Sequence, residues 1–558
     1  MTQLDSQTSQ KPRLRERLEK GGFAVAVELV TNRGVITTAT SQAAIEMAHE
    51  LATDPRIDVI SITDNPGGHA MLAPDTFGTD LVSRGQEVII HLACKDWNRG
   101  ALESRGWKLA SEGFHNVLAL SGDFPLKGFR GAPAPVFDID SVGLLKLFSE
   151  MNEGLPDDRR PGAGRLDRTD FFLGCVVTNH KRFEREVVPQ YQKLRKKAAA
   201  GAQFVINQIG WNARKDDELL RYIRRAQLPL FALGNVYLLS RAASRVFHSG
   251  RIPGVVVTDE LLDLAERYSA GRDKGRSYFV DLAAKQAAVV RGLGFNGVYL
   301  GGHADAATFY EILQRAEGYA QEWHAVAKEI GYGRPDEFYL FEPDPDTGLS
   351  SDELSRSYVE SKRQRKTDLP VPVRYRVSRL LHNAVFDPDA PLFGAGRALY
   401  QRIEAAPPAV GRAAHVVEQA AKVSMFNCLD CGDCSLPDIA YVCPESMCAK
   451  NQRNGPCGGT RDGLCEVYDT ECIWSDAYER LKAYGESDDI LDGPVVIKDN
   501  ALRRTSAWAN TFLGRDHNTR DEADATHQID AKRDVGGPAQ EPQSTETASG
   551  DASQPRGS

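Results

Sequence analysis

Two carboxylic acids stand in apolar runs, where an ionised side chain is costly. Glu28 interrupts AVAVELV, and Asp123 follows Ser121 and Gly122 at the end of HNVLALSGD. In a strand buried on both faces a carboxylate is unfavourable unless it is paired, so either Glu28 lies at a wet strand end or its pKa is raised. A raised pKa suits a general acid at neutral pH. The alternatives are a salt-bridged Glu28 at a barrel rim and an Asp123 that caps a helix.

Other polar side chains follow the same kind of run. Gln208, beside Asn207, offers a donor and an acceptor, which suits a pterin or amide edge. Thr63 and His91 finish two further runs, and Lys197 lies in the helical segment LRKKAAAGA. Each also has an ordinary interpretation, as a structural amide, a core histidine or a surface lysine.

Eight of the ten cysteines are clustered in the C-terminal third of the chain. Clustering in a large chain that shows no signal peptide predicts metal binding rather than disulfides, and eight thiols divide into two four-cysteine sites. CxxCxxC followed by Cys-Pro is typical of an Fe–S cluster, although the gap before the fourth cysteine is longer than usual. Structural zinc tolerates any loop, so both metals remain open. The predicted ligands are Cys428, Cys431, Cys434, Cys443, Cys448, Cys457, Cys465 and Cys472.

Eight apolar runs that end in a polar group must position these residues. Segments of helical period lie between most of them, such as 41–54 and 101–114. This alternation predicts an α/β fold, a (β/α)8 TIM barrel whose active site lies at the C-terminal strand ends. An open doubly wound sheet is the alternative, but it needs a Gly-rich loop after the first strand, where the chain has TNRG. The runs are 24–31, 58–68, 87–94, 117–123, 171–179, 203–211, 228–235 and 297–303.

The overall charge and hydropathy limit the kind of partner. A net charge of -9 without a sustained basic face argues against nucleic acid and anionic membrane surfaces. No apolar run approaches the about 18 residues of a membrane span, and the first residues show no export signal. We therefore expect small-molecule chemistry in the cytoplasm.

Composition divides the chain into five parts. Residues 1–20 form an N-terminal segment with a short amphipathic helix from Arg13 to Lys20 that covers the barrel bottom. The remaining parts are the barrel, a connector, a cysteine-rich metal-binding module, and a tail whose polar composition predicts disorder. They cover residues 21–330, 331–374, 375–490 and 491–558, respectively.

Five motifs in order resemble the methylenetetrahydrofolate reductase family over about residues 20–330. The cysteine region resembles the C-terminal domain fused to some bacterial members. The motifs are VEL around Glu28, SITDNPGG (61–68), HLACKDWNR (91–99), NVLALSGD (116–123) and KAAAGAQFVINQ (197–208).

The resemblance implies a (β/α)8 barrel that holds FAD, with FMN as the alternative, reduced by NADH or NADPH. The reaction is reduction of 5,10-methylenetetrahydrofolate to 5-methyltetrahydrofolate, in one-carbon metabolism and methionine supply. Glu28 matches the acid that protonates the folate ring, Asp123 the acid that contacts the pterin and tunes the flavin, and Gln208 a folate-binding glutamine. The implied flavin-binding positions are Thr63, His91, Ser121, Gly122, Asp123 and Lys197.

The chain also departs from the family pattern. Ser121 stands where the family often has arginine, so one cationic contact to the flavin is absent, and CVVTNHK (175–181) lacks a tyrosine that many members have. Two alternatives remain, a flavin-free folate-binding methyltransferase or demethylase partner, and a non-catalytic folate- and metal-binding subunit. A ferredoxin donor, an electron-donor partner protein and a homo-oligomer also remain open. The long stretch from Gly302 to Cys428 gives no reason to place the cysteines near the flavin, which favours a structural role.

Overall fold

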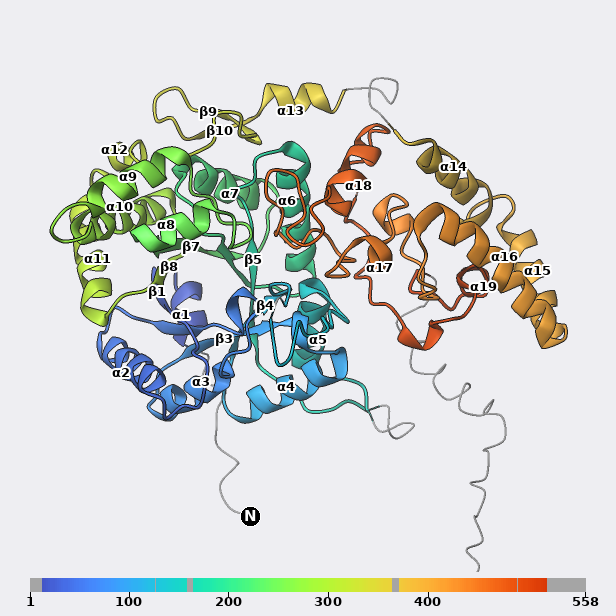
Figure 1. Ribbon diagram of the computed structural model, residues 1–558, viewed down its shortest axis with the longest axis horizontal. Coiled ribbons are helices and arrows are strands. Elements are labelled where there is room, and N and C mark those ends of the chain that lie inside the picture. The colour runs from blue at the N-terminus through green and yellow to red at the C-terminus, as the bar shows by residue number, and fades with distance from the viewer. Residues whose placement is uncertain (1–12, 126, 158–163, 364–370, 489, 519–558) are drawn as a thin grey trace, which may run out of the picture.

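Eight parallel strands close into a barrel in the computed structural model, which describes residues 13–125, 127–157, 164–363, 371–488 and 490–518 (Figure 1). The strands pair in sequence order, and β1 closes the barrel against β8 with Ala24 opposite Gly297. This confirms the predicted (β/α)8 barrel, and the alternative open sheet is wrong. The strands are β1 (Ala24–Leu29), β2 (Val59–Ile62), β3 (Val88–Ala93), β4 (Asn116–Leu120), β5 (Phe172–Val177), β6 (Phe204–Asn207), β7 (Phe231–Leu238) and β8 (Gly297–Gly302).

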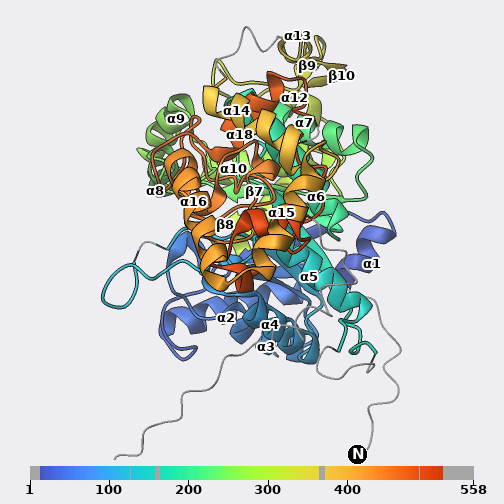
Figure 2. The same cartoon turned by 90° about the vertical axis from the view of Figure 1, so that its right-hand side faces the viewer.

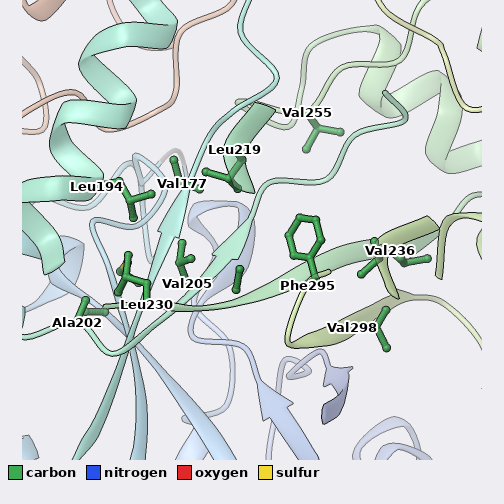
Figure 3. Packing of buried hydrophobic residues seen from close by; sticks show 14 of the residues in the cluster. Val177, Leu194, Ala202, Val205, Leu219, Leu230, Val236, Val255, Phe295 and Val298 are labelled. Atoms are coloured by element: carbon green, nitrogen blue, oxygen red, sulfur yellow. The ribbon is translucent and has the colours of Figure 1, made fainter. Parts of the chain in front are cut away.

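The strands are apolar on both faces because each face packs against a separate core. Inside the barrel, Phe172 stacks on Phe204, and Leu14 and Leu18 of α1 (Arg13–Glu19) join this cluster, which confirms the predicted N-terminal helix. The outward-facing side chains pack against the helices, and Figure 3 shows Val205 of β6 among them. Buried runs of this kind are typical of parallel sheets covered by helices.

Helices cover the outside of the barrel between the strands. Most begin with a side-chain cap; Asp140, for example, accepts hydrogen bonds from Val142 N and Gly143 N at the start of α5. The barrel helices are α2 (Ala39–Thr53), α3 (Pro74–Ser83), α4 (Arg99–Ser111), α5 (Ser141–Glu153), α6 (Glu184–Ala199), α7 (Ala213–Arg225), α8 (Arg241–His248), α9 (Asp259–Ser269), α10 (Arg276–Leu293), α11 (Ala306–Tyr319) and α12 (Trp323–Ala327).

The connector and the C-terminal region lie against one side of the barrel (Figures 1 and 2). The connector forms an antiparallel pair, β9 (Phe341–Pro343) and β10 (Ser350–Leu354), which packs on α7. The remaining helices are α13 (Arg356–Ser361), α14 (Val373–Leu381), α15 (Phe393–Ala405), α16 (Pro408–Phe426), α17 (Pro444–Met447), α18 (Ile473–Lys482) and α19 (Ala507–Phe512).

The C-terminal region is docked on the barrel through a shared core and buried lysines. Trp474 and Tyr478 of α18 belong to the same hydrophobic cluster as the barrel helices, and α18 packs on α6. Lys193 of α6 donates hydrogen bonds to Gly455 O at 3.0 Å and Pro456 O at 3.1 Å. This proximity was not expected from the sequence, because separation along the chain does not limit separation in space.

The predicted disordered tail begins too early. Between residues 490 and 518 the chain forms α19, buries Leu502 and Phe512, and donates a hydrogen bond from Asn510 Nδ2 to Gly432 O at 2.8 Å. The few apolar side chains here are enough to order this segment, because they pack against other parts of the C-terminal region, as Phe512 does on Phe386 and Tyr400. Residues 519–558 lie outside the described part of the chain. Within that described part, no helix has both the length and the apolar composition needed to cross a membrane.

Candidate functional site

A cavity of about 270 Å³ lies at the C-terminal ends of the barrel strands. Parallel strands of a closed barrel bring their carboxyl ends to one face, so residues far apart in sequence meet there. Seven of the eight predicted barrel-site residues line it: Glu28, Thr63, His91, Ser121, Gly122, Asp123 and Gln208.

Lys197 is the exception. It lies in α6, and its ammonium donates a hydrogen bond to Val176 O at 2.6 Å without lining the cavity. Burial lowers its pKa to about 8. The Lys197 side chain connects α6 to β5 through this hydrogen bond. The structure therefore does not support a direct contact between Lys197 and a ligand.

Glu28 is a buried carboxyl group with a raised pKa. The Tyr299 hydroxyl donates to its Oε1 at 3.2 Å, and burial raises the Glu28 pKa to about 6 although this hydrogen bond lowers it. No ion pair to Glu28 occurs among the described residues, so the salt-bridge alternative is wrong. His91 Nε2 lies 2.8 Å from Ser61 Oγ, and burial lowers the His91 pKa to about 3, so His91 is neutral.

We expect the buried Glu28 to make stability pH-dependent. Its folded-state pKa of about 6 lies above the ordinary 4.5, so the contribution of Glu28 to stability is greatest below pH 4.5 and is lost as the pH rises through 6. At pH 8 the buried charge costs about 2 kcal/mol. We therefore compare the unfolding free energy of Glu28→Gln with that of the wild type at each pH. The difference should favour the variant by about 2 kcal/mol more at pH 8 than at pH 4.5.

Urea titrations at the two pH values measure this difference. Glu46→Gln, at an exposed position of α2, is the control and should show no such change between the two pH values. An equal effect of Glu28→Gln at both pH values would contradict the raised pKa.

Asp123 joins two strand-end loops. Its Oδ2 accepts a hydrogen bond from Gly67 N at 2.7 Å, whereas α5 is capped by Asp140, so the helix-cap interpretation of Asp123 is wrong. Gly122 has φ +86°, and a Cβ there would lie 3.0 Å from the Ala93 side chain, so this turn needs glycine.

Gln208 presents an amide to the cavity. Its Oε1 accepts from Ile209 N at 2.9 Å, and its NH2 group donates to no other described residue. The oxygen is therefore held in place while two donors stay available for a ligand.

Among the polar residues of the cavity that sequence reasoning missed are three from the barrel, Tyr299, Asn235 and Asp64. Tyr299 holds Glu28, Asn235 has a buried Oδ1 without a hydrogen-bond partner among the described residues, and burial raises the pKa of Asp64 to about 6. Tyr299 and Asn235 interrupt apolar runs in the same way as Glu28, and that signal could have found them.

The C-terminal region contributes to the same cavity. Its residues there are Lys450, Cys457, Gly458, Gly459 and Glu466. A second cavity of about 1180 Å³ shares Asp123, Gly459 and Glu466 with the first. Together the two cavities exceed the usual volume of a small-molecule site.

The eight clustered cysteines form two groups of four. Burial raises the pKa of the Cys428 and Cys434 thiols, and Cys431 and Cys443 lie close enough to both to raise it further. The second group gathers around one small cavity lined by Cys448, Cys457, Cys465 and Cys472. The predicted division into two four-cysteine metal sites stays a prediction.

The two sets differ in their relation to the barrel. Cys457 lines the strand-end cavity, whereas no member of the first group does. The first group borders a separate cavity near α16 and α19, which Cys434 lines. The second group is therefore the one beside the predicted active site.

Residues 407–500 match the family described as methylene-tetrahydrofolate reductase C terminal. The predicted fused C-terminal domain is thereby confirmed, and the match continues past the predicted boundary at residue 490. No curated protein matches the chain.

Solved structures share only a loose likeness. One is an uncharacterized protein from Clostridium thermocellum that binds two copies of 5-methyl-5,6,7,8-tetrahydrofolic acid, with 10% identity, TM-score 0.41, and coverage of 55% of this chain and 99% of that one. Another is EDTA monooxygenase from Chelativorans sp. BNC1, with 10% identity, TM-score 0.34, and coverage of 54% and 93%.

The clustered thiols of the C-terminal region suit a soft metal ion or an Fe–S cluster. Burial raises the pKa of Cys434 and Cys448 to about 12, so these thiols must lose protons to bind metal. Among the described residues, no three His, Cys, Asp or Glu side chains are already arranged to hold an ion. The metal therefore stays a prediction that rests on the donor set.

The barrel cavity suits a heterocycle with alternating donors and acceptors, such as a flavin or a pterin. Asn235 Oδ1 offers a buried acceptor, the Gln208 NH2 group offers donors, and Asp123 offers a carboxylate. A buried acceptor without a partner is costly, and a ligand N–H would satisfy it.

Proposed function

We propose that this protein reduces 5,10-methylenetetrahydrofolate to 5-methyltetrahydrofolate with a flavin that NADH or NADPH reduces. The observation that carries the proposal is the position of Glu28. Its side chain combines a pKa of about 6 with a place in a strand-end cavity that a methylene-tetrahydrofolate reductase C-terminal domain closes. Opening the five-membered folate ring requires a proton on a ring nitrogen, and a carboxylic acid with such a pKa can donate it near neutral pH.

The remaining cavity residues orient the ligands. Tyr299 holds the Glu28 carboxyl group, and the Gln208 amide can bind the pterin edge. The flavin, when bound, supplies the hydride. The residues proposed to hold it are Thr63, His91, Ser121, Gly122 and Asp123.

The visible absorbance of the freshly purified full chain tests this function. We expect flavin bands that bleach when NADH or NADPH is added without oxygen and return when 5,10-methylenetetrahydrofolate is added. Bands that bleach but do not return with the folate would contradict the proposed substrate. A protein without flavin that takes up none of the added FAD or FMN would contradict the redox reaction.

A flavin-free folate-binding subunit is the second candidate. The positions of Lys197 outside the cavity and of Cys457 to Gly459 inside it favour this alternative, because both reduce the contacts available to a flavin. Calorimetric titration with 5-methyltetrahydrofolate separates the two functions. Folate binding by a protein that takes up neither FAD nor FMN would support the second candidate.

A further inference from the structure

The strand-end cavity contains one cationic side chain. Its lining includes four carboxyl groups, those of Glu28, Asp64, Asp123 and Glu466, whereas Lys450 is the only lysine or arginine among the described residues that line it. If no cation were present, these carboxyl groups would repel a ligand with a negative or electron-rich edge. Lys450 is therefore the group on which binding of that edge depends.

Two of the three ammonium N–H groups of Lys450 are already used. One donates to Gly122 O at 2.9 Å, directly before Asp123, and another forms an ion pair with the Glu466 carboxylate. An ammonium carries three donors, so one N–H remains for a ligand. Lys450 is 5% exposed, which means that bulk water does not compete strongly for this donor.

The backbone of Lys450 is fixed to the barrel by Gln452. The Gln452 side chain donates to Lys450 O at 2.9 Å, and its Oε1 accepts from Ser121 Oγ at 3.0 Å and from Lys193 Nζ at 3.1 Å. Trp474 Nε1 donates to Gln452 O at 3.1 Å. The C-terminal domain thus holds Lys450 rigidly over the end of β4, as a binding group requires.

We propose that Lys450 is a ligand-binding residue of the barrel site, and that its remaining N–H binds the carbonyl edge of a fused pyrimidine ring. Both a pterin and an isoalloxazine carry such an edge. The inference rests on the proposed function and deepens it, since both the barrel and the C-terminal domain would then supply residues that contact the ligand. It also supplies a cation to the cavity lining, which contains no other lysine or arginine among the described residues.

The experiment compares four full-length proteins: wild type, Lys450→Gln, Lys450→Arg and Lys196→Gln. Glutamine at 450 can still bond Gly122 O but lacks the charge, and arginine restores the charge. Lys196 is the matched control, because it is a buried lysine of the same interface that donates to Pro494 O at 2.8 Å and does not line the cavity. Equilibrium dialysis with 5-methyltetrahydrofolate and, separately, with FAD measures affinity, and thermal unfolding measures stability.

We expect Lys450→Gln to weaken binding of at least one probe by about tenfold or more, the size of a lost hydrogen bond from a charged donor. Lys450→Arg should recover most of this loss, and Lys196→Gln should lower the unfolding temperature without changing affinity. The probe that is affected identifies the ring that Lys450 contacts.

If Lys450→Gln binds both probes as tightly as the wild type does, the inference is wrong and the proposed function still stands. Equal losses of affinity in Lys450→Gln and Lys196→Gln would overturn it in favour of a structural role. If the wild type binds neither probe, the proposed function fails and the inference fails with it.

Discussion

Glu28→Gln should lower the turnover of 5,10-methylenetetrahydrofolate by at least about a hundredfold, the usual scale of general-acid catalysis. Glutamine keeps the size of the side chain and can still interact with Tyr299, but it has no proton to donate. Reduction of the flavin by NADH or NADPH needs no proton from Glu28 and should continue. Stopped-flow measurement of the two half-reactions separates these effects.

The pH profile gives the same prediction an independent test. Glu28 must be protonated to act, so turnover should be highest below its pKa of about 6 and fall as the pH rises above it. The hydrogen bond from Tyr299 lowers that pKa, so Tyr299→Phe should move the falling limb to higher pH. Glu46→Gln is the control and should leave both half-reactions unchanged. Equal loss in both half-reactions of Glu28→Gln would indicate a structural role instead.

Replacing cysteines in the two groups should have large but different effects. A structural metal contributes on the order of 10 kcal/mol to the folding of a small domain, because a preformed site is absent from the unfolded chain. We expect Cys431→Ser with Cys434→Ser to lose one metal site and destabilise the C-terminal domain while the barrel still binds its ligand. Cys457→Ser with Cys465→Ser should lose the other site and also weaken ligand binding, since Cys457 lines the barrel cavity.

Elemental analysis, thermal unfolding and folate titration measure these effects. Cys94→Ala, in the barrel core, is the control and should leave the metal content unchanged. Equal effects of the two double variants on ligand binding would contradict the difference between the groups. A folded variant that keeps oxidation of NADH or NADPH and loses only a ferredoxin-linked activity would show that the cysteines carry electrons.

The sequence by itself determined the barrel and most of its site. Apolar runs that recur between helical segments are buried on both faces, and a closed parallel barrel is a stable way to arrange eight of them. Once the strands are parallel, their carboxyl ends meet, so Glu28, Asp123 and Gln208 had to share one face. The cysteine spacing likewise predicted two groups of four.

Only the tertiary structure decided which side chains reach the cavity. Lys197 follows a matching motif but points to Val176 O, whereas Lys450, far along the chain, lines the cavity beside Gly122. The local pattern around a residue reports its burial and secondary structure, but it contains no information about a partner from another domain. The docking of α18 on α6 depends on the shapes and buried hydrogen bonds of two complete surfaces, and these exist only after both domains have folded.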